Sequence, residues 1–277
     1  MSVLVLAALL AAPCAALEVR VDPAEAGPGD VLRVEVLDGG DPARVSLTFR
    51  GRPYPLYPLG DGRLRALIGL TAESPPGKEP VSVVCKRRLL RDRRAEAAVT
   101  IVGRTFTPQK LTMPAGRAKL TAEPGAKDAT ARIRAAAAVD SPRQRWAGPL
   151  LLPAAGRVSA SYGHPRTVNA KPWAWHKGVD IAVPEGTPVT APNAGIVVLA
   201  GSYPLQGGTV VIDHGQGLMS ALFHLGEVLV HAGDEVSASS PVARVGGAGF
   251  STGAHLHWGT YLHGAAVDPE ALTKRAL

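Results

Sequence analysis

The chain has 277 residues, which is enough for two domains of ordinary size. It is basic, with a formal net charge of +7, so anionic partners have to be considered. Its basic residues are not interleaved with aromatic ones in a platform that could stack on bases, which argues against a nucleic-acid-binding protein.

The chain begins with an apolar run, residues 2–16, that ends in small side chains. The run is too short to span a bilayer, and its pattern predicts that residues 1–16 are a secretory signal peptide cleaved near Ala16. It departs from that pattern because no Lys or Arg precedes it, and Pro13 fits lipid attachment at Cys14 poorly. We therefore expect an exported protein without a transmembrane span after cleavage. Its remaining cysteine, Cys85, would have no partner for an intramolecular disulfide bond.

From residue 17 to about residue 104, apolar residues alternate with polar ones in short runs separated by Gly and Pro. This alternation is typical of strands with one buried face, and several such strands predict a small antiparallel sandwich of immunoglobulin type. No group of polar residues here suggests catalysis, so we interpret residues 17–104 as a spacer or positioning domain. The alternating positions are Leu32, Val34, Val36, Val45, Leu47, Phe49, Leu64, Ala66, Ile68, Leu70, Val81, Val83, Cys85, Val99 and Ile101.

One run within this domain, residues 86–94, is the densest basic segment of the chain. Runs of this kind are usually solvated hairpin tips, and this is the interpretation that we favour. The alternative is a short-range attraction to anionic wall polymers or lipid headgroups.

Residues 105–149 are predicted to connect two domains, because Pro and Gly interrupt any long element. The exception is an alanine-rich stretch over residues 129–139, which we predict to be a helix. Asp128 is placed to begin it, and Ser141-Pro142 to end it.

The remaining residues, 150–277, contain four histidines and an aspartate in a suggestive pattern: His176, Asp180, His224, His255 and His257. Neutral imidazoles and one carboxylate are ligands that zinc prefers, and three protein ligands leave a fourth position for water, as in catalytic sites. The flanking Gly, Pro and Val residues predict strands and turns. Residues two or four apart on a strand share a face, so we expect each close pair to point the same way.

Each pair alone is weak evidence, because histidines often sit half-buried or at turns. The combination within one region of domain size is much stronger. The other four histidines, His164, His214, His231 and His263, lie in predicted loops and turns, and we do not expect them to be ligands.

Several segments of this region together resemble the lysostaphin/LytM-type zinc endopeptidases of bacterial cell walls. The resemblance covers residues 150–270 and follows the family's order, although Ala254 stands where proline is common and Phe223 replaces a frequent tyrosine. The matching segments are residues 176–189, which begin His-Lys-Gly-Val-Asp, and residues 210–215, 221–225, 251–259 and 267–269.

The resemblance implies an all-β peptidase domain, a half-barrel sheet, over residues 150–277. It also implies that His176, Asp180 and His257 hold one zinc ion per chain and that His224 and His255 are the catalytic histidines, with their separate roles open. The implied activity is hydrolysis of peptide bonds in peptidoglycan stem peptides or cross-bridges, in the periplasm or at the cell wall. We expect residues 150–277 to be sufficient for this chemistry.

The sequence leaves two other functions to compare with this one. A non-catalytic activator that binds peptidoglycan on the same fold would have no reason to retain all five site residues. A lipoyl-type carrier, suggested by the turns at residues 186–195 and 230–236, needs a lysine at a hairpin tip. No lysine lies between Lys177 and Lys274, which excludes the carrier.

Overall fold

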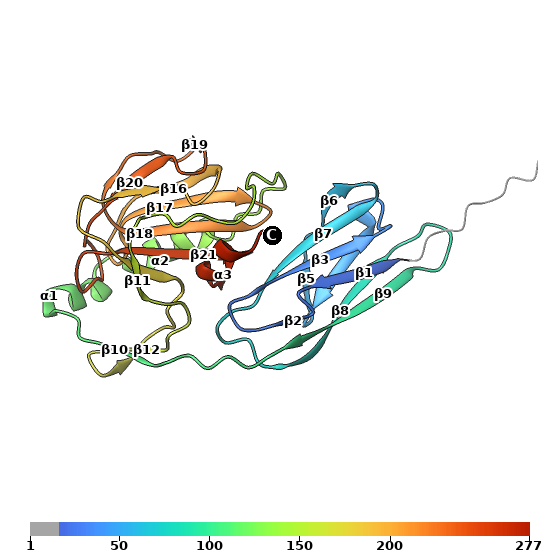
Figure 1. Cartoon of the computed structure of the whole chain (residues 1–277), viewed down its shortest axis with the longest axis horizontal. Coiled ribbons are helices and arrows are strands. Elements are labelled where there is room, and N and C mark those ends of the chain that lie inside the picture. The colour runs from blue at the N-terminus through green and yellow to red at the C-terminus, as the bar shows by residue number, and fades with distance from the viewer. Residues whose placement is uncertain (1–16) are drawn as a thin grey trace, which may run out of the picture.

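The computed structural model describes residues 17–277, which form two β-sheet assemblies and a segment that connects them (Figure 1). The predicted signal peptide, residues 1–16, and Cys14 within it lie outside the described residues. Among residues 17–277, no helix is both long and apolar enough to cross a membrane.

The N-terminal part is a sandwich of a four-stranded and a five-stranded sheet around one hydrophobic core. Its strands are β1 (Glu18–Asp22), β2 (Glu25–Ala26), β3 (Val31–Leu37), β4 (Val45–Phe49), β5 (Arg52–Tyr54), β6 (Tyr57–Gly60), β7 (Arg63–Gly69), β8 (Gly77–Cys85) and β9 (Arg93–Ile101), with a short 3-10 helix, η1 (Pro42–Arg44). The first sheet has the order β1-β3-β7-β6 and the second the order β2-β9-β8-β4-β5. The first order matches strands A-B-E-D of an immunoglobulin domain, and the three central strands of the second sheet, β9-β8-β4, match strands G-F-C. The predicted immunoglobulin-like sandwich is therefore confirmed.

Alternation of side chains explains why these segments form a sandwich. In β4, Val45, Leu47 and Phe49 are buried and the residues between them are exposed. Successive side chains of a strand point to opposite faces, so one face of each sheet enters the core and the other meets solvent. Cys85, at the end of β8, is buried in this core as a free thiol.

The connecting segment contains β10 (Gln109–Leu111), α1 (Ala115–Ala118), a 3-10 helix η2 (Lys119–Ala122) and α2 (Ala126–Ala136). The helix α2 lies slightly earlier than the stretch 129–139 in which we predicted it. Gly125, with a positive φ of 82°, precedes its first residue, so Asp128 lies in the first turn and not before the helix. An acidic residue is still favourable there, because the N-terminus of a helix carries partial positive charge.

The C-terminal part is built on a ten-stranded antiparallel sheet that does not close into a barrel. Its path is β11-β14-β21-β18-β17-β16-β19, with β15, β20 and β22 paired beside it. The strands are β11 (Arg157–Ala160), β14 (Val179–Ala182), β15 (Pro188–Thr190), β16 (Gly195–Tyr203), β17 (Gly207–Gly215), β18 (Leu218–Val228), β19 (Glu235–Val236), β20 (Pro241–Val245), β21 (Leu256–Leu262) and β22 (Ala265–Val267), followed by α3 (Pro269–Lys274).

A small three-stranded sheet joins the connecting segment to the C-terminal part. Strand β10 pairs in parallel with β12 (Arg166–Val168), which pairs with β13 (Lys171–Pro172). On another side of the large sheet, Ile133 and Ala136 of α2 pack against Ala221 and Phe223 of β18. The connecting segment is therefore packed onto the C-terminal part along much of its length.

The two parts also share a packed interface. Val31 and Leu67 of the sandwich belong to the hydrophobic core of the C-terminal part. Gly69 approaches that part so closely that a Cβ atom there would lie 2.8 Å from Cγ1 of Val267, which explains the need for glycine. Burial of these apolar side chains holds the sandwich against the C-terminal sheet.

Candidate metal centre and its cleft

The three candidate ligands meet where β14 pairs with β21. In the antiparallel register of these strands, Asp180 lies opposite His257. His176 lies in the loop before β14, and its Nδ1 donates to the carbonyl oxygen of Ser161 at 2.7 Å. The prediction that His176 and Asp180 share a strand face is wrong, because β14 begins only at Val179. The loop brings His176 to the same point. It is held there by the bond to Ser161 and by two backbone hydrogen bonds of 2.9 Å, from His176 N–H to His164 O and from Gly163 N–H to His176 O.

The ligand atoms form a compact triangle. Nε2 of His176 lies 3.0 Å from Oδ1 of Asp180 and 3.1 Å from Nδ1 of His257, and the latter two atoms lie 2.8 Å apart. Because Nδ1 of His176 is the donor to Ser161, its Nε2 carries a lone pair. Two imidazole nitrogens and a carboxylate oxygen repel one another at these distances unless a proton or a cation lies between them. Two imidazoles and one carboxylate suit zinc, so the donor set fits a divalent metal ion.

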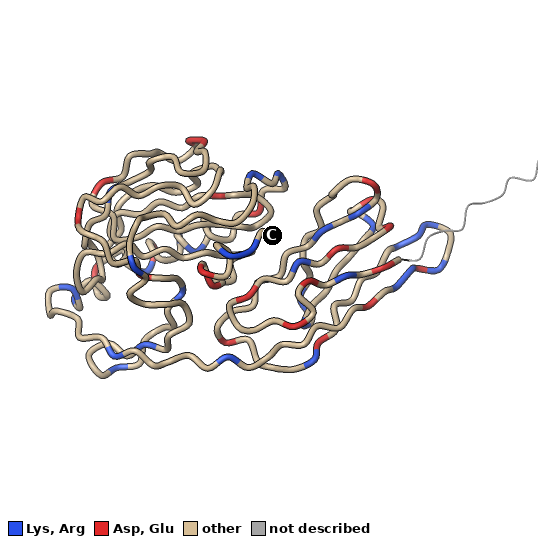
Figure 2. The backbone as a smooth tube through the Cα atoms, in the orientation of Figure 1, with Lys and Arg blue, Asp and Glu red and all other residues tan. Residues whose placement is uncertain are grey.

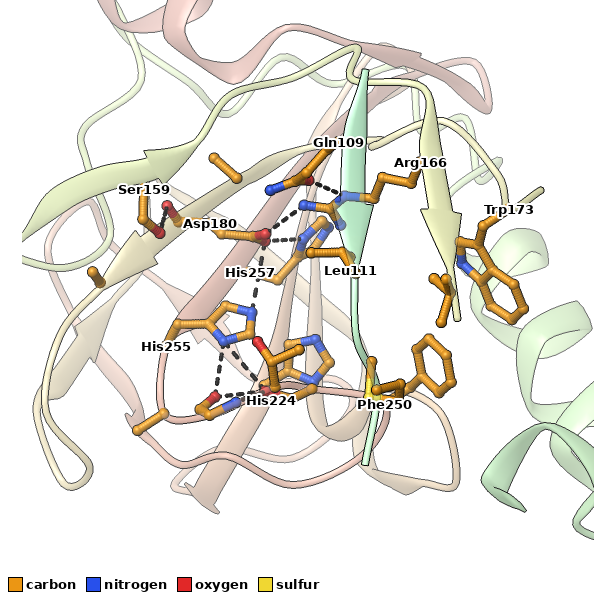
Figure 3. A pocket seen from close by; sticks show the side chains of 18 residues that line it. Gln109, Leu111, Ser159, Arg166, Trp173, Asp180, His224, Phe250, His255 and His257 are labelled. Atoms are coloured by element: carbon orange, nitrogen blue, oxygen red, sulfur yellow. Dashed lines mark hydrogen bonds and ion pairs between the residues drawn. The ribbon is translucent and has the colours of Figure 1, made fainter. Parts of the chain in front are cut away.

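Asp180 is ionised and held from its other side. Burial acts to raise its pKa, but the contacts with His176 and His257 outweigh burial and hold the pKa of this carboxyl well below its usual range. Its second oxygen, Oδ2, accepts a hydrogen bond from Nη2 of Arg166 at 2.7 Å. Nε of Arg166 in turn donates to Oε1 of Gln109 at 2.6 Å, so strand β10 of the connecting segment reaches the centre (Figure 3).

His224 lies beside this triangle in an unusual backbone conformation. Its φ is 62°, in the left-handed region, and the pairing of β18 shifts register directly after it. Its Nδ1 donates to the carbonyl oxygen of Ala248 at 2.9 Å, which leaves a lone pair on Nε2. Burial, together with the neighbouring His255 and His257, lowers the pKa of His224 to about 3.

His255 is the second histidine beside the ligands. Its ring centroid lies 4.8 Å from that of His224, and its Nε2 lies 3.7 Å from Oδ1 of Asp180. Its Nδ1 donates to the carbonyl oxygen of Gly253 at 2.9 Å. Burial lowers the pKa of His255 as well. Both side chains are therefore neutral imidazoles near neutral pH, with Nδ1 hydrogen-bonded to the backbone and Nε2 able to accept a proton.

The same part of the chain is recognised by comparison with known proteins. Residues 174–269 match the model of peptidase family M23. This region is an M23 peptidase domain. The resemblance expected from the sequence motifs is thus confirmed.

Similarity to one crystal structure extends beyond the M23 domain. A putative peptidase M23 from Pseudomonas aeruginosa has a TM-score of 0.64 and 29% identity, and the match covers 89% of this chain and 94% of that one. A match of this extent includes the sandwich and the connecting segment, so the two-part architecture is shared.

Two curated relatives match a shorter part of the chain. Peptidoglycan DD-endopeptidase ShyA of Vibrio cholerae is 36% identical over 116 residues, which are 40% of this chain and 26% of that protein. DD-carboxypeptidase/endopeptidase Mpg of Neisseria meningitidis serogroup B is 33% identical over 113 residues, 41% of this chain and 26% of that protein. The chain therefore matches about a quarter of the length of these relatives.

The M23 domain presents its centre in a cleft of about 330 Å³. One wall comes from the connecting segment, through Gln109, Leu111 and Met113. A second cavity of about 360 Å³ shares Arg166, Trp173 and His257 with the first, so open space lies on two sides of the centre. An extended chain could therefore pass over the candidate ligands.

Most residues of this cleft were not predicted from the sequence, and Arg166, Gln109, Trp173 and Phe250 are the notable ones among them. Arg166 contacts the candidate ligand Asp180 directly, and Gln109 contacts Arg166. Trp173 stacks on Phe250, with ring centroids 4.9 Å apart. Gln109 and Arg166 begin the short strands β10 and β12, and a single Gln or Arg at such a position has no spacing signal. The two tryptophans Trp173 and Trp175, separated by one residue, were the visible hint of a loop with a role.

The remaining histidines lie away from the triangle, as expected. His164 hydrogen-bonds Thr107, and His214 is fully buried between Ala194 and Ser220. His231 is exposed, and His263 stacks on Tyr57 at the interface with the sandwich.

Proposed function

We propose that this protein is an exported, zinc-dependent endopeptidase that cleaves peptide bonds in peptidoglycan. The observation that carries the proposal is the meeting of His176, Asp180 and His257 beside two neutral imidazoles, within an M23 domain. His176, Asp180 and His257 would hold a single zinc ion. Zinc bound there would supply Lewis acidity, which makes a water molecule more acidic and polarises a carbonyl oxygen.

His224 and His255 are the groups that can move protons in this cleft. Each has Nδ1 fixed to a backbone carbonyl, so each exposes a basic Nε2 in a set direction. One can accept the proton of the attacking water. The other, once protonated at Nε2, can donate to the departing amine or to the oxygen that gains negative charge. Their closeness allows either assignment.

Peptidoglycan is proposed as the substrate because the relatives ShyA and Mpg carry names that specify DD-endopeptidase activity. Space on both sides of the centre suits a peptide that continues beyond the scissile bond. Export is proposed from the apolar run at residues 2–16, which would place the enzyme in the periplasm or at the cell wall.

The direct test is digestion of purified sacculi, with released muropeptides identified by mass. We expect the protein to release peptide-cleaved products, to stop with a chelator and to recover when zinc is returned. The matched control is His231→Ala, which alters an exposed histidine outside the cleft and should remain active. Binding to sacculi without product release in the zinc-loaded protein would favour the activator instead.

A further inference from the structure

The tip of the β8–β9 hairpin exposes two adjacent leucines. Leu89 is 91% exposed and Leu90 is 65% exposed, more than any other large hydrophobic side chain in the described part of the chain. Apolar side chains lower the free energy when they leave water, and here none of that gain is realised within the molecule. A contiguous apolar pair at a protruding tip is therefore a candidate contact surface.

Cations surround this pair on both sides. Six of the nine residues in the tip, 86–94, are basic and only Asp92 is acidic: Lys86, Arg87, Arg88, Arg91, Arg93 and Arg94. Figure 2 shows them gathered at the end of the hairpin.

Internal contacts give the tip a defined shape. Nε of Arg87 donates to the carbonyl oxygen of Arg91 at 3.0 Å, and its backbone N–H donates to Asp92 at 3.3 Å. Arg93 pairs with Asp38 of the neighbouring turn at 3.1 Å. Arg88 and Arg91 are exposed, like the two leucines between them. The apolar pair is thus presented on an ordered, cationic turn.

We propose that this tip, residues 86–94, docks the protein onto an anionic lipid bilayer. A soluble anionic polymer could neutralise the arginines but would leave Leu89 and Leu90 in water. A bilayer satisfies both, because the leucines enter the boundary of the acyl chains while the long basic side chains remain among the headgroups. The combination of charge and apolar exposure therefore selects the lipid surface.

The position of the tip suits this role. It lies at one end of the long axis of the molecule, and the C-terminal part with its cleft lies toward the other end (Figure 1). The first strand starts near the tip, because Glu18 pairs with Leu37, next to the Asp38 that contacts Arg93. Docking at this end would leave the C-terminal part, with its cleft, at the end of the molecule far from the bilayer. It does not depend on hydrolysis, so it can be tested separately from the proposed activity.

The test is cosedimentation of residues 17–277 with vesicles of phosphatidylcholine, alone or with phosphatidylglycerol added. This part of the chain contains every residue of the described cores and lacks the apolar run 2–16, which would bind lipid by itself. We expect binding to the vesicles with phosphatidylglycerol and weaker binding as salt rises. Leu89→Ser with Leu90→Ser should weaken binding by about tenfold or more. Arg88→Ser with Arg91→Ser should weaken it by a similar factor.

The chain offers matched controls for both pairs. Leu151→Ser with Leu152→Ser changes another exposed leucine pair, 45% and 48% exposed, in the C-terminal part. Lys127→Ser with Arg132→Ser removes two exposed cations of α2. Both should bind vesicles as the unmodified protein does. Equal binding by the Leu89/Leu90 variant, or an equal loss in the Leu151/Leu152 control, would overturn the proposal. The proposal would also be overturned if the protein bound to sacculi but not to the lipid vesicles.

Discussion

Asp180 uses its two carboxylate oxygens for different partners. Oδ1 faces His176 and His257, while Oδ2 accepts a hydrogen bond from Arg166. The pair is largely shielded from water, since the two side chains are 14% and 13% exposed. Groups that hold a metal ligand from behind fix its orientation and tune affinity for the metal. Arg166 is in this position and is held there by Gln109.

Substitution Arg166→Gln should therefore weaken zinc binding by about tenfold or more, without removing a ligand. The affinity can be measured in competition with a chromophoric chelator, on protein shown to be folded by circular dichroism. Arg166→Lys should recover part of the affinity because an ammonium group can again donate a hydrogen bond to Oδ2 of Asp180. Arg244→Gln, which breaks an exposed pair with Glu227, is the control and should bind zinc normally. Unchanged affinity in Arg166→Gln would show that the pair is only structural.

Ligands and proton carriers should separate by mutation. Asp180→Ala and His257→Ala should lose both zinc and activity, because two remaining side chains hold the ion poorly. His224→Ala and His255→Ala should keep zinc but lose turnover by about a hundredfold or more. Metal content and kcat, measured on the same preparations, check this. Loss of zinc in His224→Ala with retention in His176→Ala would reverse our assignment.

Spacing and family motifs were enough to find the five candidate residues, because each belongs to a short segment with its own pattern. They could not find Arg166 or Gln109. Gln109 lies far from Asp180 in the sequence and reaches the site only because β10 pairs with β12. Such contacts depend on tertiary packing, for which the local sequence has no periodic signal.

At the scale of elements, the strands of the sandwich and those of the large C-terminal sheet differ in how well their sequences predict them. In β4, buried and exposed residues alternate, whereas every residue of β17 is buried. A strand covered on both faces loses the period of two, so its sequence resembles any short apolar segment. The sandwich strands could therefore be predicted from alternation, while the sequence of β17 stood out only through the resemblance of residues 210–215 to a family segment, and His214, expected in a turn, lies within this strand.

His214, in β17, has a consequence for stability. It is fully buried, with Nδ1 donating to Ala194 O at 2.8 Å, and burial lowers its pKa to about 4 from an ordinary value of 6.5. Between these values the unfolded chain binds a proton that the folded one does not. The stability contributed by the neutral side chain is therefore complete above about pH 6.5 and is lost as the pH falls toward 4.

We expect His214→Asn to flatten this dependence. Between pH 6.5 and 4.5 the free energy of unfolding of this variant should fall less steeply than that of the unmodified protein. The two slopes should differ by at most about 1.4 kcal/mol per pH unit. Asn can still donate to Ala194 O but does not titrate in this range. Denaturant unfolding at several pH values measures the difference, and identical slopes would show that His214 is not the titrating group.

At the scale of the whole molecule, the connecting segment lies between the sandwich and the M23 domain. Its β10 forms part of the cleft wall, and its α2 packs on the large sheet through Ile133. The expectation that residues 150–277 are sufficient for chemistry therefore needs revision. A fragment that starts at residue 150 lacks Gln109, and with it the group that holds Arg166 against Asp180.

Two truncated proteins test whether catalysis needs the connecting segment, with a soluble piece of peptidoglycan as the substrate. Residues 105–277 retain the cleft wall and should keep most of the turnover, whereas residues 150–277 should lose about tenfold or more through misplacement of the ligand. Both have to be shown folded, because loss of the sandwich uncovers Val267 and could cause aggregation. Gln109→Ala in the full chain gives the same comparison without truncation. Full activity in a folded fragment of residues 150–277 would confine catalysis to the M23 domain and leave the connecting segment to position it.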